Sequence, residues 1–193
     1  MLNPSDQICV DKVLAGDSSA FAVLVERHKN NVFNICVKIL GSREEAEEVA
    51  QDTFLKVYEK LDTFKKESKF STWLFRIAYN MSISQQRKTK HNHSEIDDYQ
   101  LENFTEDDLV DQLHLELKEE REKRLKSAIQ KLDGEQQLLL QLYYDKEMSV
   151  VQVAEITELS ESNVKVKIHR TRQRLFKLMQ TTANTTVKNA QYD

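Results

Sequence analysis

Glycine and proline are scarce in this 193-residue chain, which contains three glycines and one proline. Both residues interrupt helices, glycine through its backbone freedom and proline through its missing N–H group and its rigid ring. Charged residues make up 31% of the chain, and helix-forming residues are abundant throughout. The composition therefore predicts an all-α protein.

Cysteine is equally scarce, and the residues of most catalytic or metal sites are missing. Cys9 and Cys36 are too few for a disulfide framework or a zinc site, and the five histidines lack companion ligands. The chain has no glycine-rich phosphate loop, no H-E-x-x-H motif and no nucleophile elbow. We therefore expect no enzyme activity, no cofactor and no bound metal.

Long apolar runs are also absent. No stretch of about 18 apolar residues occurs, as a membrane-spanning helix would need. The first residues, MLNPSDQICVDK, lack the charged and then apolar layout of a secretory signal. These features predict a protein of the reducing cytoplasm.

The most informative stretch of the chain is residues 149–179, which reads as two helices joined by a tight turn. Ser149 and Gln152 form a capping-box pattern, and Ser160 is placed to cap the second helix. Between Ser160 and Gln180 there are six basic residues and one acidic residue, which give a local charge of +5 in a chain whose net charge is −4. A short helix, a turn and a basic second helix are typical of a DNA-binding helix-turn-helix, although a solvated basic surface is the simpler alternative.

Two earlier segments could also bind a partner. Acidic residues crowd the first half of a helix expected from Arg43 to about Leu61, which indicates either favourable helix-dipole interactions or a surface for a basic partner. A polar loop, residues 62–70, precedes a helix that we expect Ser71 to cap and that mixes aromatic and basic residues. Such a mixture suits single-stranded DNA, but core packing is the favoured interpretation for Trp73.

The charge pattern divides the chain into two small helical domains. From His93 to Leu117 there are nine acidic residues and no lysine or arginine, which predicts an acidic, flexible linker. We expect a first helical domain over residues 5–90, the linker over 91–117, a helix-turn-helix domain over 118–180 and a flexible tail over 181–193.

The order of these parts resembles that of bacterial RNA polymerase sigma factors of the extracytoplasmic-function (ECF) group, within the sigma-70 family. The resemblance covers residues 11–88 and 119–179 and rests on three motifs in order, namely SREEAEEVAQDTFLKVYEKLDTF, KFSTWLFRIAYN and SVVQVAEITELSESNVKVKIHRTRQRL. Each motif is weak alone, but the three together at this spacing are specific.

The resemblance implies three sets of site residues. Those matching the −35 reader lie on the second helix of the helix-turn-helix: Ser162, Asn163, Lys165, Val166, Lys167, His169, Arg170 and Arg172. Those matching the segment that recognises and melts the −10 element are Phe64, Lys65, Lys66, Phe70, Ser71, Arg76, Asn80 and Arg87. Those matching the segment that docks on a coiled coil of the largest polymerase subunit are Glu47, Glu48, Gln51, Asp52 and Phe54.

The function that the resemblance implies is promoter-specific transcription initiation, with core RNA polymerase, promoter DNA and an anti-sigma factor as partners. The alternatives are a two-domain transcription regulator with an effector-sensing first domain, and a helical adaptor without a DNA role. Two positions depart from the family pattern. Family members usually carry glycine in the turn where this chain has Glu158, and often an acid where it has Ser84.

Overall fold

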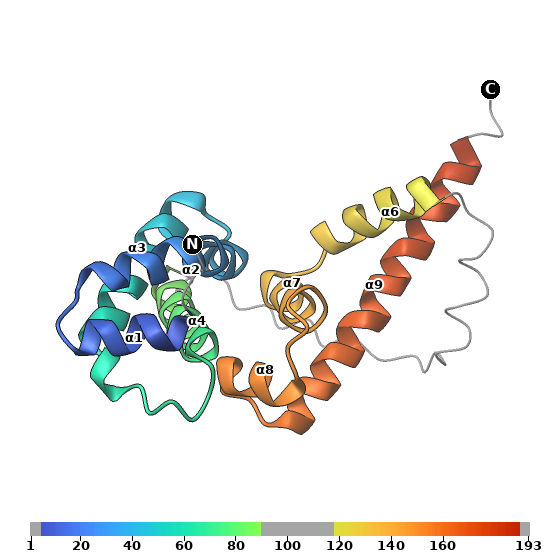
Figure 1. Ribbon diagram of the computed structural model, residues 1–193. Coiled ribbons are helices and arrows are strands. Elements are labelled where there is room, and N and C mark those ends of the chain that lie inside the picture. The colour runs from blue at the N-terminus through green and yellow to red at the C-terminus, as the bar shows by residue number, and fades with distance from the viewer. Residues whose placement is uncertain (1–4, 90–117, 190–193) are drawn as a thin grey trace.

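The computed structural model describes residues 5–89 and 118–189, and within the second range it describes the side chains of residues 121–180. All regular elements in these ranges are helices, as the composition predicts. They form two groups, seen at the left and right of Figure 1, which we call the N-terminal bundle (residues 5–89) and the C-terminal bundle (residues 118–189). The acidic linker expected over residues 91–117 lies outside the described residues.

The N-terminal bundle contains four α-helices and one short 3-10 turn. In order these are α1 (Asp6–Leu14), α2 (Ser19–Leu40), α3 (Arg43–Glu59), η1 (Leu61–Thr63) and α4 (Phe70–Thr89). The long helix α2 packs against α1, α3 and α4, so it forms the centre of the bundle. Its inward apolar residues include Leu24, Val32, Ile35, Cys36 and Ile39, which recur at helical spacing along one face.

Local signals place most of the helix ends correctly. Gly41 ends α2 in the left-handed conformation (φ 74°) that a glycine adopts without strain. The hydroxyl of Ser42 then accepts a hydrogen bond from the backbone N–H of Glu45, which caps α3. The cap predicted at Ser71 is wrong, because α4 begins one residue earlier, at the buried Phe70. The backbone carbonyl of Lys69 accepts hydrogen bonds from the N–H groups of Thr72 and Trp73.

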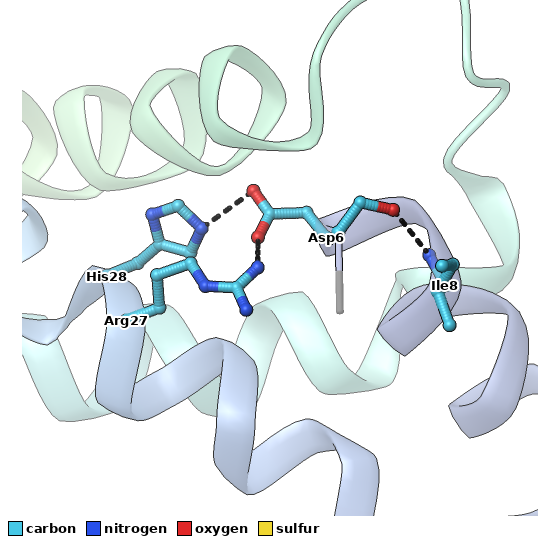
Figure 2. A network of polar contacts seen from close by, with 5 residues as sticks. Asp6, Ile8, Arg27 and His28 are labelled. Atoms are coloured by element: carbon cyan, nitrogen blue, oxygen red, sulfur yellow. Dashed lines mark hydrogen bonds and ion pairs between the residues drawn. The ribbon is translucent and has the colours of Figure 1, made fainter. Parts of the chain in front are cut away.

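His28 belongs to the core although it is polar. Its side chain is buried in α2, and its ring lies against those of Phe70 and Phe75. Asp6, at the start of α1, binds both Arg27 and the Nε2 atom of His28, the latter at 2.9 Å (Figure 2). This network ties α1 to α2, and it could not be predicted because its partners lie more than 20 residues apart in the chain.

The C-terminal bundle contains four α-helices and one π-helical turn. These are α6 (Lys118–Gln130), α7 (Gly134–Leu140), η2 (Gln141–Asp145), α8 (Val150–Thr157) and α9 (Glu161–Asn189). Asp133 caps α7 by accepting a hydrogen bond from the N–H of Gln136, and Ser149 and Gln152 close the predicted capping box on α8. In Figure 1, α6 lies along α9, and α8 lies at the end of the bundle nearest to α4.

Helix α9 is longer than predicted. We expected a flexible tail from Thr181, but the helix continues to Asn189. The segment from Thr181 to Asn189 contains no glycine or proline, and a helix that has already formed extends at little cost through residues that do not break it. Its polar composition therefore did not mark the end of the helix.

Candidate functional site

The basic helix α9 presents its predicted reading face to solvent. Ser160 caps the helix, since its hydroxyl accepts a hydrogen bond from the N–H of Asn163 at 3.2 Å. Val164 and Ile168 are buried in the bundle core, and the opposite side of the helix is turned outward. The exposed members of the predicted set are Ser162, Asn163, Lys165, Val166, His169, Arg170 and Arg172.

Lys167 is the exception in this set. It is only partly exposed, and its Nζ atom donates a hydrogen bond to the carboxylate of Glu135 on α7 at 2.7 Å. Lys167 therefore ties α9 to α7, whereas the other members of the set face outward.

The turn before α9 holds the residue that departs from the family pattern. Glu158 ends α8 with φ 57° and ψ 26°, the left-handed conformation that glycine adopts at least cost. The turn thus has the geometry of a glycine turn although it carries a glutamate. The side chain of Glu158 is used in a contact with the other bundle, because its Oε1 atom accepts a hydrogen bond from Nδ2 of Asn80 at 2.8 Å.

The residues predicted to open the −10 element divide into an exposed and a buried group. Lys65, Lys66 and Arg87 are exposed, and Ser71, Arg76 and Asn80 are partly exposed. Phe64 and Phe70, by contrast, are buried around Trp73, with ring centroids 5.3 and 6.1 Å from the tryptophan. In this structure the aromatic residues of the segment form core, as favoured for Trp73, and the cations and amides form its surface.

The loop before α4 is held to α1 by an ion pair. Lys66 has a left-handed backbone (φ 62°), and its Nζ atom lies 2.6 Å from the carboxylate of Asp11. The hydrogen bond from Lys66 lowers the pKa of Asp11 below its ordinary value. Both side chains are about half exposed, so this contact is open to solvent and to competing anions.

The acidic surface of α3 is continuous with two apolar side chains. Glu47, Glu48, Gln51 and Asp52 are exposed, and Phe54 is partly buried. Leu55 and Tyr58 stand beside these acids one to two turns further along the helix, and they are 64% and 48% exposed. Sequence reasoning missed both residues. The available signal was that Leu55 falls outside the helical spacing of the inward residues of α3, so burial does not account for it.

Two further features bear on the class of protein. Within residues 5–89 and 118–189, no cluster of histidine, cysteine and acidic side chains has the arrangement of a metal site. In the same ranges, none of the helices combines the length and apolarity needed to cross a membrane.

Two family models match the chain, one in each bundle. Sigma-70 region 2 matches residues 24–92, and Sigma-70 region 4 matches residues 122–175. The chain is 31% identical to the ECF RNA polymerase sigma factor SigW of Bacillus subtilis over 180 residues, which cover 87% of this chain and 93% of that protein.

Solved structures share the fold. CnrH, in complex with the cytosolic domain of CnrY, aligns with a TM-score of 0.63 at 24% identity, over 92% of this chain and 99% of that one. The sigma factor RpoE of Bartonella quintana, in complex with the anti-sigma factor NepR, aligns with a TM-score of 0.58 at 22% identity, over 83% of this chain and 96% of that one. The fold, the two family models and the similarity over most of both chains agree, and the chain therefore belongs to the ECF group of sigma-70 family RNA polymerase sigma factors, which direct core RNA polymerase to initiate transcription at specific promoters.

Proposed function

We propose that α9 reads the −35 element, that α4 and the loop before it read and melt the −10 element, and that α3 docks on core polymerase. The observation that carries this division is the separation of charge over the described surface. The exposed face of α3 is acidic, and the exposed face of α9 is basic. One protein can therefore bind a basic protein surface and a polyanion without either surface interfering with the other.

The chemistry of the α9 face supports DNA reading. Lys165, Arg170 and Arg172 supply cations for phosphates, which set position and affinity. Ser162 and Asn163 are placed at the start of the helix, where side chains reach base edges in a helix-turn-helix complex. Val166 is 46% exposed, and an exposed apolar side chain among cations suits contact with a thymine methyl group.

The −10 segment supports strand opening through its exposed cations and amide. Removing a base from the stack costs a few kcal/mol, and a pocket for the base offsets part of that cost. Asn80 can hydrogen-bond to a flipped base, while Lys65, Lys66 and Arg87 can bind the phosphates on either side. Because Phe64 is buried in this structure, its role in such a pocket requires that its ring move outward.

The docking surface on α3 includes more than the acidic residues. Glu47 pairs with Arg43 at 2.9 Å, but such an exposed pair is worth little and leaves the carboxylate available. Leu55 and Tyr58 add apolar area beside Gln51 and Asp52, and protein interfaces combine an apolar centre with a polar rim. We therefore include these two residues in the polymerase-docking surface.

Four broader assignments complete the proposal. The chain acts as a binding factor without enzymatic activity, and it works in the cytoplasm together with polymerase and promoter DNA. It forms two functional domains at the predicted boundaries, except that the helix of the second extends past residue 180. The solved relative from Bartonella quintana is bound to an anti-sigma factor, and we propose a partner of the same kind for this chain.

Transcription in vitro with purified core polymerase tests the proposal. Lys165→Ala should weaken promoter binding by the holoenzyme and lower the slope of log K against log salt by about 0.9, because one phosphate contact is lost. It should leave the affinity for core polymerase unchanged. Asp52→Lys should do the reverse and weaken core binding.

Lys146→Ala is the matched control, since Lys146 is an exposed lysine outside α9. Its promoter affinity and salt slope should equal those of the wild type. Loss of core binding in Lys165→Ala, or an equal loss of promoter affinity in both lysine variants, would contradict the assignment of roles.

A further inference from the structure

The N-terminal and C-terminal bundles share one hydrophobic core. Helix α4 packs against α8, and α2 packs against α7, so two helices of each bundle take part (Figure 1). Apolar side chains from both bundles belong to a single buried cluster, which includes Leu74 of α4, Leu139 of α7 and Val153 of α8. Partly buried residues of the contacting helices pack on the same cluster, among them Ile77 and Met81.

Gly134 shows how closely the two bundles approach. A Cβ atom added to this glycine would lie 1.7 Å from the backbone carbonyl oxygen of Lys38 and 2.8 Å from its carbonyl carbon. Both are backbone atoms within α2, so they cannot move aside as the end of a side chain could. No residue other than glycine is compatible with this contact, although any common residue could begin α7.

Polar contacts surround the apolar contact. Asn80 donates its hydrogen bond to Glu158, and Lys38 donates one to Oε1 of Gln137 at 3.5 Å. Burial lowers the pKa of Lys38, partly offset by the nearby Asp145 of the C-terminal bundle. Burial also raises the pKa of Tyr79 to about 12, with further contributions from charges that include Glu135 and Glu158. The titrating groups of one bundle therefore respond to charges on the other.

We propose that the face formed by α2 and α4 is a binding surface for the C-terminal bundle of the same chain, and that this closed arrangement covers the Asn80 side of α4 until the bundles separate. The inference rests on the proposed function in one respect, namely that Asn80 contacts the −10 element. Glu158 then has a role that the glycine usual at its position cannot perform, since it occupies the hydrogen-bonding group of Asn80.

The closed arrangement affects the two DNA-reading segments differently. Apart from Lys167, the α9 residues assigned to the −35 element remain exposed, whereas Asn80 is engaged by the other bundle. The free chain can thus present its −35 reader while Asn80 of its −10 reader is engaged by Glu158. Separation of the bundles, for instance on docking to polymerase, would free α4.

Small-angle X-ray scattering on the isolated 193-residue chain tests the closed arrangement without any DNA. Gly134→Ala should increase the radius of gyration, because the added methyl group is incompatible with the backbone of α2. Glu158→Ala should increase it to a smaller extent. Glu147→Ala is the matched control: Glu147 is an exposed glutamate with the same left-handed backbone (φ 50°), and no hydrogen bond or ion pair joins it to another described residue.

A radius of gyration that is the same in Gly134→Ala and the wild type would overturn the proposal. Circular dichroism shows whether each variant is folded. If Gly134→Ala does not fold, Asn80→Asp replaces it, because a carboxylate at residue 80 would repel Glu158 and open the bundles. An unchanged radius in that folded variant would equally overturn the proposal.

Binding of a labelled single-stranded DNA pool of random sequence separates this inference from the proposed function. Opening together with tighter DNA binding in Gly134→Ala supports both. Opening without any gain in DNA binding supports the contact surface and removes the support for Asn80 as a DNA contact. Absence of opening refutes the contact surface, whatever the DNA result.

Discussion

Replacing Glu158 with glycine should separate two opposing effects on stability. The left-handed backbone of a non-glycine residue costs about 1–2 kcal/mol, which glycine removes. Glycine also gives the unfolded chain more conformational freedom, which lowers the free energy of unfolding by about 0.4–1 kcal/mol. The net gain from the backbone alone is therefore about 0.8 kcal/mol.

The same substitution removes the hydrogen bond from Asn80 to Glu158. A hydrogen bond typically contributes about 0.5–1.5 kcal/mol, and this one lies at an exposed rim. Glu158→Gly should thus be close to the wild type in stability, with the two effects cancelling. Glu147→Gly relieves the same kind of strain without losing such a bond, so it should be more stable than Glu158→Gly by about 1 kcal/mol.

Urea unfolding is the assay, and the chain provides a convenient probe. Trp73 is the only tryptophan and lies in α4, so its fluorescence reports on the N-terminal bundle although both substitutions are in the C-terminal one. Circular dichroism follows both bundles together. A double-mutant cycle with Asn80→Ala should give a coupling energy of about 1 kcal/mol for Glu158 and about zero for Glu147. Equal stabilisation by the two glycine variants, with no coupling to Asn80, would refute this reasoning.

Two further predictions concern the core and the alkaline range. Leu74 is fully buried, so Leu74→Ala should lower the free energy of unfolding by about 2–5 kcal/mol. Guanidinium unfolding measures this loss, and a smaller loss would show that neighbouring side chains move into the space left by Leu74. Tyr79 has its pKa raised to about 12, mainly by burial, so its proton is held in the folded chain and released in the unfolded chain between pH 10 and 12. The free energy of unfolding that this raised pKa contributes is complete below pH 10 and is lost as the pH rises to about 12. Tyr79→Phe should lack this part of the alkaline loss of stability, and absorbance at 295 nm should show one late-titrating tyrosine fewer. An identical titration in the variant would contradict the assignment.

The closed arrangement has a consequence for regulation. The anti-sigma partner proposed above need not cover every DNA-reading residue of this chain if α8 already covers part of α4. Stabilising the contact between the bundles would keep Asn80 of the −10 reader engaged by Glu158. Glu158 and Gly134 are two positions at which this property can be changed without altering the α9 reading face.

The amino-acid sequence by itself determined the helices and most of their ends. Scarce glycine and proline made the chain helical, and short-range signals such as Ser149 with Gln152 act within one turn, so they can be read without the fold. The apolar residues of α2 recur every three or four positions, which is enough to define its inward face, and the basic residues of α9 predicted a DNA-binding helix. These features depend only on neighbours along the chain.

Tertiary structure alone decided which distant residues meet. Burial of Phe64 and Phe70 around Trp73, the exposure of Leu55, and the network of Asp6 with His28 all follow from how the helices pack. Glu158 illustrates the difference most clearly. Its departure from the usual glycine was visible in the sequence, but its contact with Asn80 spans 78 residues and arises only because α8 packs on α4. Side-chain pairing across such a separation is set by the packing of whole helices, which no local pattern encodes.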